Sequence, residues 1–466
     1  MRAHDRALWA IAVILSVLIL VGPALWNGFP LLQYDTGGYL SAWYDGRLHI
    51  NRSAPYGLLL VAGQEPDFWP VLLLQSALTV WVLALTLRAH RFGNRPLLLL
   101  AMIAALSIFT TLPWLTAILL TDIFAGLAVL ALYLLLLRDD TLTRGERVGL
   151  VVFVAASMAT HSATMLVLCG LLAVATIVWF VDRARITTPR LMRGVATLLL
   201  GTLIVLFANA LVTGRFGWAY GGYALSFGRM LQDGIVKNFL DDHCPDPTLR
   251  LCPYKDQLPH DADEFFWASD LFNNLGRFDG MRGEMRRIAL ESLADYPILQ
   301  LESAFTETAK QLTMVETGAG VVKWVVDTYY SIKDHVPAAM PGMLAARQRH
   351  PGIEFTEINR LQVPLAYLAM ALSPVIALVA LRRQGFGDIG ELAAVVALAI
   401  LANATVFGTF ATAHNRYGAR LIWLPAFVAL IALARLAASH RALSEATGLP
   451  RQTWYARLFS RAVSLF

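Results

Sequence analysis

Residues 7–29 read ALWAIAVILSVLILVGPALWNGF, and no side chain in this run carries a charge. A helix needs roughly 20 apolar residues to cross the ~30 Å hydrocarbon layer of a bilayer, so the run is long enough to span one. It is too long for the core of a signal peptide and lacks a small-residue cleavage site. We therefore expect it to stay in the protein as the first transmembrane helix.

The whole chain has the composition of a membrane protein. Of its 466 residues, 57% are hydrophobic and only 15% are charged, and the mean hydropathy is +0.56. A soluble protein of this length does not carry such a composition. In lipid the backbone must satisfy its own hydrogen bonds, which Leu-, Ala- and Val-rich runs do as helices. The sequence predicts an all-α polytopic membrane protein.

The hydrophobic runs predict about ten transmembrane helices. They lie near residues 7–29, 68–87, 96–112, 116–137, 148–163, 165–181, 194–213, 363–381, 391–412 and 419–436. Two longer hydrophobic stretches are each divided into two of these runs, because each stretch is too long for a single helix. Residues 96–137 are twice too long for one helix, and Pro113 supplies the break. Residues 148–181 hold no formal charge, and we divide them at His161, with a re-entrant hairpin as the alternative.

Arginine placement sets the expected orientation, because cytoplasmic loops of membrane proteins are enriched in Lys and Arg. The arginines that fall on one side of this arrangement are Arg2, Arg6, Arg88, Arg91, Arg95, Arg138, Arg144, Arg147, Arg183, Arg185, Arg190, Arg193, Arg382, Arg383, Arg435 and Arg441. We expect that side to be the cytoplasm of a bacterial inner membrane, with both termini inside. The formal net charge of +5 is then a signal of topology, and no nucleic-acid partner is expected.

This topology divides the chain into four parts. Residues 1–213 form an N-terminal transmembrane module, whose external loop at 30–67 we expect to be catalytic, and residues 363–437 form a C-terminal one. Between them, residues 214–362 hold 20 of the 33 Asp and Glu residues and every lysine, which predicts a mostly helical extracytoplasmic insertion. Residues 438–466 are expected to form a cytoplasmic tail, either an amphipathic helix on the membrane surface or a disordered basic segment.

The insertion contains two cysteines that are eight residues apart, Cys244 and Cys252, in a stretch rich in Pro and Asp. An oxidising compartment outside the membrane would join them in a disulfide. A zinc site with His243 and His260 is the alternative, although the irregular histidine spacing does not favour it. We expect the disulfide.

Polar residues gather at the external ends of several predicted spans. Asp35 follows the first span in Gln33-Tyr34-Asp35-Thr36-Gly37-Gly38-Tyr39-Leu40, and Asp122 lies one or two turns inside the external end of its helix. An Asp beside two glycines also fits a helix cap or a turn. Charges within a membrane are costly, however, and usually functional. The other residues expected at this level are His161, His414, Arg416, Tyr417 and Arg420. We infer a polar pocket that opens outward.

Several features follow one another in a recognisable order. An external acid with a nearby tyrosine (Asp35, Tyr39) precedes an Arg-x-x-Pro-Tyr stretch at residues 52–56. Later, Asp122 continues into a Leu/Ala-rich helix, and Arg416-Tyr417 stand before the last helix. This order resembles the GT-C superfamily of integral-membrane glycosyltransferases, which take sugars from polyprenyl-phosphate donors. The likeness covers the first four spans and, less fully, the last one.

The resemblance implies a role for each polar residue. Asp35 is similar to the superfamily's first-loop catalytic acid, and Asp122 to the acid on a later helix. The residues implied in binding the donor phosphate or lipid are Arg52, Tyr56, Arg416, Tyr417 and Arg420, and those implied elsewhere in the pocket are Tyr39, His161 and His414. The first loop lacks the superfamily's Asp-x-Asp or Glu-x-Asp pair. Assistance by a divalent metal is therefore left open, and no metal ligand is assigned.

These residue types suit sugar transfer. Guanidiniums bind the oxygens of a departing phosphate bidentately. The acceptor loses a proton as it attacks, and a carboxylate within hydrogen-bond reach can accept that proton. We expect partial burial to raise the pKa of Asp35 toward the working range. A base on the face opposite the phosphate gives inversion. The hypothesis is an inverting glycosyltransferase that uses a polyprenyl-phosphate-linked sugar and a lipid, glycan or protein acceptor.

Other functions remain open from the sequence. Transport or flipping of a lipid or solute is one, although the two halves contain no obvious inverted repeat. A non-catalytic protein of envelope-polysaccharide assembly is another. Membrane O-acyl transfer would need an intramembrane histidine with a polar partner, which His161 and Ser162 supply only in part.

Overall fold

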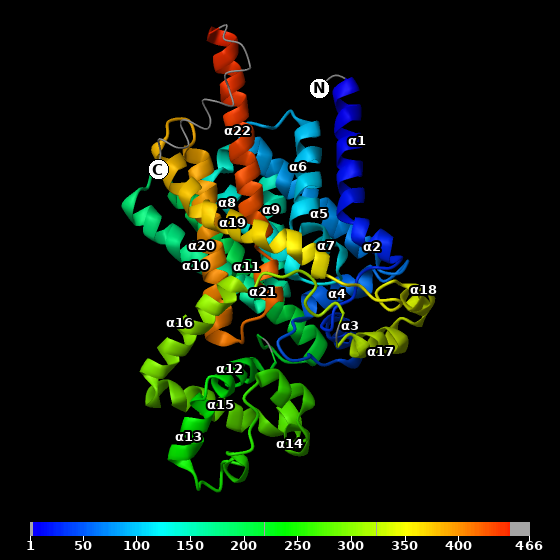
Figure 1. Cartoon of the computed structure of the whole chain (residues 1–466), viewed down its shortest axis with the longest axis vertical. Helices are drawn as coiled ribbons and strands as arrows, with labels where there is room; N and C mark the ends of the chain where they lie inside the picture. The colour runs from blue at the N-terminus through cyan, green and yellow to red at the C-terminus, as the bar shows by residue number, and fades with distance from the viewer. Residues whose placement is uncertain (1–2, 219, 323, 448–466) are drawn as a thin grey trace.

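The computed structural model describes residues 3–218, 220–322 and 324–447. Within these ranges the chain forms helices and connecting loops, and its β-structure is limited to an isolated bridge between Leu31 and Ile118. Figure 1 shows an upright bundle of helices with a smaller group of helices below it. The predicted all-α fold is confirmed for the described residues.

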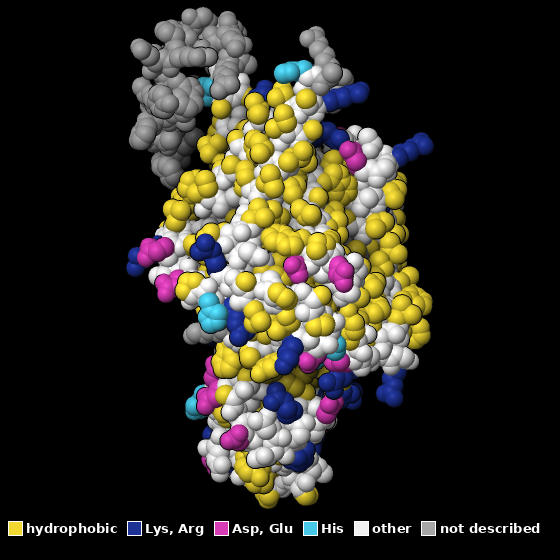
Figure 2. All heavy atoms as spheres, turned by 90° about the vertical axis from the view of Figure 1, so that its right-hand side faces the viewer, with side chains coloured by type: hydrophobic (Ala, Val, Ile, Leu, Met, Phe, Trp, Pro, Cys, Tyr) yellow, Lys and Arg dark blue, Asp and Glu magenta, His cyan; other side chains and the backbone are white. Residues whose placement is uncertain are grey.

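Six helical segments among the described residues are long and apolar enough to cross a membrane. They are α5 (Trp69–Ala89), α10 (Ser162–Val181), α11 (Thr188–Thr213), α19 (Thr356–Arg382), α20 (Gly387–Phe410) and the segment Asn415–His440, which contains α21 (Asn415–Ala419) and most of α22 (Trp423–Thr447). The bundle also contains α1 (Ala3–Leu20), α6 (Pro96–Phe109), α8 (Asp122–Leu137) and α9 (Arg144–Thr160). Hydrophobic side chains cover the bundle in Figure 2, as expected of a membrane-embedded protein.

α8 is the central helix of the bundle. Its residues from Asp122 to Leu136 are all buried, and it packs against α5, α9, α10, α11 and α20. Its sequence is apolar on every side, and a helix of this kind is stable only when other helices surround it. The position of α8 therefore decides where Asp122, its first residue, lies.

Two predicted spans differ from the helices that form. The run 7–29 is divided into α1 and α2 (Gly22–Asn27), because Pro23 cannot continue the hydrogen bonding of α1. Residues 116–137 do not form one helix: α7 (Leu112–Ala117) ends early, and α8 starts only at Asp122. The backbone between them bonds to Leu31 instead. Asp122 thus begins its helix, and the prediction that it lies one or two turns inside was wrong.

The predicted insertion, residues 214–362, contains two separately packed parts. We call residues 222–295 the lower unit; it contains α12 (Gly222–Gln232), α13 (Ile235–His243), α14 (Asp270–Asn274) and α15 (Arg277–Asp295). Its own hydrophobic cluster includes Phe227, Phe265 and Phe272. α16 (Pro297–Thr313) leads from the lower unit back to the bundle and packs along α20.

The second part, residues 314–322 and 324–355, crosses the end of the bundle that carries Asp35 and is called the strap. It contains α17 (Val326–His335) and α18 (Met340–Ala345), and it joins the core of the bundle through residues such as Val321 and Ile332. The hydroxyl of Thr328 accepts a hydrogen bond from the Gly37 amide at 3.0 Å and donates to the Gln33 carbonyl at 2.9 Å. The strap therefore holds the backbone on both sides of Asp35.

The predicted disulfide between Cys244 and Cys252 is confirmed and lies in the lower unit. Both sulfurs are consumed in this bond, which rules out the alternative zinc site with His243 and His260. The predicted tail, residues 438–466, is described only as far as residue 447, where α22 ends, and residues 448–466 lie outside the described part.

α16 approaches α20 closely at Gly408. A Cβ atom at Gly408 would lie 2.4 Å from the backbone nitrogen of Thr308. We expect Gly408→Ala to destabilise the protein by about 1–3 kcal/mol, because α16 must move away. Thermal unfolding in detergent measures the effect. Gly170→Ala is the matched control, since its Cβ would meet Ala402 at an ordinary 3.8 Å. Equal midpoints for the two variants would contradict this packing.

Candidate functional site

Asp35 stands immediately before α3 (Thr36–Asp45), and its side chain makes no capping hydrogen bond to that helix. Asp35 thus occupies the N-cap position of α3 without capping the helix through its side chain, and its carboxylate bonds elsewhere. The two glycines that follow permit close approach of other segments. A Cβ at Gly37 would lie 2.7 Å from Thr328 Cα, and a Cβ at Gly38 would lie 2.9 Å from Arg52 Cδ. Because these two residues have no side chains, the strap can pack closely against Gly37 and Arg52 can pack closely against Gly38.

The carboxylate of Asp35 binds two arginines from distant parts of the chain. Arg52, just before α4 (Ala54–Ala62), donates from Nη2 to Asp35 Oδ1. Arg416 of α21 donates from Nη1 to Asp35 Oδ2 at 2.5 Å and from Nε to Asp122 Oδ2 at 2.8 Å. We call these four side chains the charged cluster. It joins the loop that follows α2, the central helix α8 and the start of the last helical segment, Asn415–His440.

The charged cluster divides into a buried and a more accessible half. The side chains of Arg416 and Asp122 are 5% and 4% exposed, whereas those of Asp35 and Arg52 are each 17% exposed. Burial opposes ionisation of Asp35, but the guanidiniums of Arg52 and Arg416 outweigh it and hold the pKa of this carboxyl well below its ordinary value. The expectation that burial raises this pKa was therefore wrong. Asp35 is a carboxylate whose two oxygens are already engaged.

Arg420 lies beside the charged cluster and is fully buried. It donates from Nε to Asn403 Oδ1 at 2.9 Å, and its Nη1 lies 3.4 Å from His161 Nδ1. Its guanidinium also lies 4.9 Å from the centre of the Phe407 ring. Among the described residues, no carboxylate forms an ion pair with Arg420. This buried positive charge is therefore suited to an anion from outside the chain.

Tyr417 and His414 form the edge of the site. The Tyr417 ring is stacked on Phe407, with centroids 3.6 Å apart, and His414 meets Tyr417 edge-on. His414 Nε2 is 2.8 Å from the Thr412 hydroxyl, and its backbone amide donates to the side chain of Gln311 in α16. These two predicted site residues thus connect the arginines to α16.

Tyr39 and Tyr56 pack beneath the charged cluster, with ring centroids 5.3 Å apart. Burial and the charge of Asp35 raise the pKa of Tyr39 to about 12, so its hydroxyl keeps its proton. The Tyr56 hydroxyl donates to Gln75 Oε1 at 3.0 Å, and the Gln75 amide donates to the backbone of α7 and the residue after it. Tyr56 is therefore engaged in the core, and the structure does not bring it to the arginines.

Several polar atoms of the site are buried without a hydrogen-bond partner. They are Arg52 Nε, Asp122 Oδ1, Arg420 Nη2 and Gln33 Nε2. Most buried polar atoms in proteins are hydrogen-bonded, so such a group of exceptions is expected where water or a ligand binds. A cavity of about 30 Å³ lies beside Asp122, Arg416 and Gln33. These atoms and this cavity mark a polar binding site.

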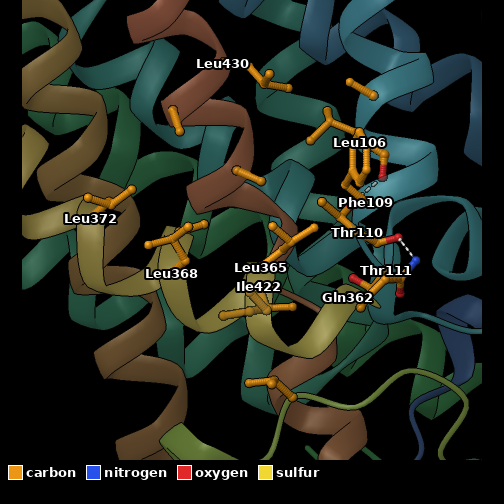
Figure 3. A pocket seen from close by; sticks show the side chains of 16 residues that line it. Leu106, Phe109, Thr110, Thr111, Gln362, Leu365, Leu368, Leu372, Ile422 and Leu430 are labelled. Atoms are coloured by element: carbon orange, nitrogen blue, oxygen red, sulfur yellow. Dashed lines mark hydrogen bonds between the residues drawn. The ribbon is translucent and has the colours of Figure 1, made fainter. Parts of the chain in front are cut away.

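A larger apolar cavity of about 270 Å³ adjoins the polar one, between α6, α19 and α22 (Figure 3). Its labelled apolar side chains in Figure 3 are Leu106, Phe109, Leu365, Leu368, Leu372, Ile422 and Leu430. Phe109 and Leu368 are exposed on the outer surface of the bundle. Thr111 lines both cavities, so an apolar chain in one can continue to a polar group in the other.

Sequence reasoning did not identify three side chains of the site. Gln33 lines the polar cavity, the Tyr34 ring lies 5.8 Å from the Arg416 guanidinium, and Asn403 binds Arg420. Gln33 and Tyr34 directly precede Asp35, but neither residue type signals an anion site by itself. Asn403 lies in an otherwise apolar span, and the cost of a polar side chain there was a usable signal.

Within the described residues, no three His, Cys, Asp or Glu side chains are grouped so that they could hold a metal ion. The chain matches no family model, no curated protein and no solved structure.

The ion pairs of Arg416 give a prediction about stability. We expect Arg416→Met to destabilise the protein by about 3–5 kcal/mol, because it leaves the carboxylate of Asp122 buried and unpaired. Adding Asp122→Asn should recover part of this loss, since a neutral amide costs less to bury. Thermal unfolding in detergent measures both effects.

Arg360→Met is the control for that experiment, because Arg360 is exposed and pairs only locally with Glu357. It should change stability by no more than about 0.5 kcal/mol. The double variant could instead lose as much stability as the two single variants lose together. In that case the broken ion pair between Arg416 and Asp122 would not be the cause of the destabilisation.

Proposed function

We propose that this protein is an inverting glycosyltransferase that moves a sugar from a polyprenyl-phosphate donor to an acceptor on the extracytoplasmic face of the membrane. The observation that supports this most directly is the meeting of an apolar cavity with a cluster of buried arginines. A lipid phosphate has the same two chemical parts, an apolar chain and an anion. The resemblance of the chain to the GT-C superfamily points the same way.

The guanidiniums suit the phosphate of such a donor. Arg52 and Arg420 each carry a buried nitrogen that lacks a hydrogen-bond partner, and Arg420 has no ion pair with a carboxylate among the described residues. Arg416 lines the polar cavity. Guanidiniums stabilise negative charge on phosphate oxygens as the bond to the sugar breaks, which makes the phosphate a better leaving group.

The apolar cavity suits the hydrocarbon chain of the donor. It lies between α6 and α19, which present apolar side chains to the outside, and reaches the polar cavity at Thr111. A chain entering from the outer leaflet would be sheltered from water along its length. Burial of apolar chain contributes about 0.8 kcal/mol per CH₂, which is ample for recognition of a lipid.

In this proposal Asp35 is the general base. The bond between the anomeric carbon and the phosphate oxygen breaks while a bond to the acceptor oxygen or nitrogen forms. The proton of the acceptor passes to Asp35, and the phosphate leaves with the electron pair. Attack from the side opposite the phosphate inverts the anomeric carbon. Asp122 keeps Arg416 in place through its 2.8 Å hydrogen bond and is a positioning residue.

The proposed membrane arrangement follows from the same reasoning. We propose about ten spans, with both termini in the cytoplasm of a bacterial cell and the charged cluster at the outer surface of its inner membrane. Arginine-rich short loops on one side and the lower unit, with its disulfide, on the other support this orientation. The acceptor is a lipid, a glycan or a protein that reaches the site beside the lower unit and the strap.

Purified protein incubated with a panel of polyprenyl-phosphate sugars tests the proposal, with release of the free lipid phosphate as the readout. We expect turnover with at least one donor and a loss of about 10²–10⁴-fold in Asp35→Asn, because the general base is removed. Glu357→Gln is the control, since Glu357 is exposed, pairs with Arg360 and lines neither cavity. Binding or bilayer transfer of the donor without turnover would instead indicate a transporter. If the protein neither bound nor turned over any donor, the result would indicate a non-catalytic assembly protein.

A second prediction concerns the apolar cavity. Ala366 of α19 lines it, and Ala366→Trp should fill much of its volume of about 270 Å³. We expect KM for a long-chain donor to rise by about tenfold or more, and KM for a short-chain analogue to change less. Leu378→Trp is the control, because Leu378 lies on the exposed face of the same helix and does not line the cavity. Equal effects on both donors would place the lipid chain elsewhere.

A further inference from the structure

The carboxylate of Asp35 occupies the place in the site where an anion would bind. Its two oxygens accept from two different guanidiniums, Oδ1 from Arg52 and Oδ2 from Arg416. Two adjacent oxygens of a phosphate accept hydrogen bonds from arginines in the same manner. The Asp35 side chain therefore satisfies the groups that, under the proposed function, must bind the donor.

The two carboxylates of the charged cluster differ in how easily they can be exchanged. Asp122 is fixed at the start of the buried helix α8, and its side chain is only 4% exposed. Asp35 lies in the first loop, is 17% exposed, and its side chain makes no capping hydrogen bond to the helix that follows it. An incoming anion can displace Asp35 by rotation of one side chain, whereas displacing Asp122 would require the bundle to open.

We propose that Asp35 is an internal substitute for the donor phosphate: it holds Arg52 and Arg416 in place while the site is empty, and the phosphate of the donor displaces it and frees it to act as the base. This inference rests on the proposed function and specifies how that function is regulated. The empty protein thus keeps its base bound to the arginines, and only donor binding releases it.

The charges of the site agree with this exchange. The two carboxylates Asp35 and Asp122 and the three guanidiniums of Arg52, Arg416 and Arg420 carry a formal net charge of +1. A sugar phosphodiester donor carries one negative charge, so the loaded site is neutral. After transfer the lipid phosphate is a monoester with up to two negative charges, and the acceptor proton on Asp35 neutralises that carboxylate. The site is then neutral again.

The exchange also supplies a route for product release. Once protonated Asp35 loses its proton to solvent, it is again an anion that competes for Arg52 and Arg416. It can then displace the lipid phosphate and restore the empty state. The tyrosines and histidines whose charge interacts with that of Asp35 are Tyr34, Tyr39, Tyr417, His49 and His161. Burial raises the pKa of Tyr34 and Tyr39 and lowers that of His49, which favours the neutral form of all three side chains.

Equilibrium binding of farnesyl phosphate, a lipid phosphate without a sugar, tests the proposal by titration calorimetry in detergent. We expect Asp35→Asn to bind it about tenfold or more tightly than the unaltered protein, because the competing carboxylate is gone; tenfold equals about 1.4 kcal/mol. The same variant should lose turnover. Asp122→Asn makes the same change of charge but releases Arg416 from its fixed partner, and should bind more weakly.

The outcomes separate this inference from the proposed function. Equal or weaker binding by Asp35→Asn would overturn the exchange while leaving the glycosyltransferase in place. No binding by any form of the protein would overturn both. Asp45→Asn, ten residues further on and paired with His335 at 3.5 Å, is the control and should bind as the unaltered protein does.

The pH dependence of the unaltered enzyme gives a test that needs no variant. In the free enzyme the arginines lower the pKa of Asp35, so the acid limb of kcat/KM should lie below the ordinary aspartate value of about 3.9. In the donor complex the phosphate holds the arginines, so the acid limb of kcat should lie at a higher pH. Coincident limbs would mean that Asp35 keeps its arginines throughout turnover and would overturn the exchange.

Discussion

The need to neutralise one buried guanidinium organises the end of the bundle at which the first loop meets the start of the last helical segment. Arg416 is 5% exposed and carries a charge that cannot be buried alone. It is satisfied by Asp35 from the first loop and by Asp122 from the central helix. Because these partners are separated by hundreds of residues in the chain, the N-terminal and C-terminal helices must meet at this point. The binding site is formed where they meet.

The central helix α8 is fixed by ion pairs at both of its ends. At one end Asp122 binds Arg416, and at the other Arg138 donates to Glu391 of α20 at 2.5 Å. Between them the helix is apolar, buried and closely packed, and a Cβ at Gly126 would lie 2.8 Å from the ring of Trp423. The packing and the paired charges act together. They fix the height of Asp122 in the bundle, and with it the depth of the polar cavity.

The strap and the lower unit serve the site in different ways. The strap is part of the main core and bonds to the backbone around Asp35, as Thr328 does with Gly37. The lower unit has a core of its own and reaches the site through α16, whose Gln311 bonds to the backbone of His414. The strap thus shares the main core and bonds next to Asp35, whereas the lower unit packs by itself and contacts the site through α16.

The sequence by itself determined the class of the fold, because the apolar runs were long enough to leave no other choice in lipid. It also identified Asp35, Asp122 and Arg416 as a group, because charged residues near the lipid boundary are costly and therefore few. It did not give the extents of α1 and α8, since a proline and a backbone bridge to Leu31 compete with helix there. The proline can be read from the sequence, whereas the bridge to Leu31 is a three-dimensional contact that apolar periodicity does not record.

Only the tertiary structure decided how the polar residues divide among roles. Tyr56 stands four residues after Arg52 in the sequence, yet its hydroxyl is held by Gln75 in the core while Arg52 reaches Asp35. The sequence also could not predict whether the pKa of Asp35 is raised or lowered from its ordinary value. Burial and neighbouring charge act in opposite directions, and which prevails depends on distances of a few ångströms between segments hundreds of residues apart.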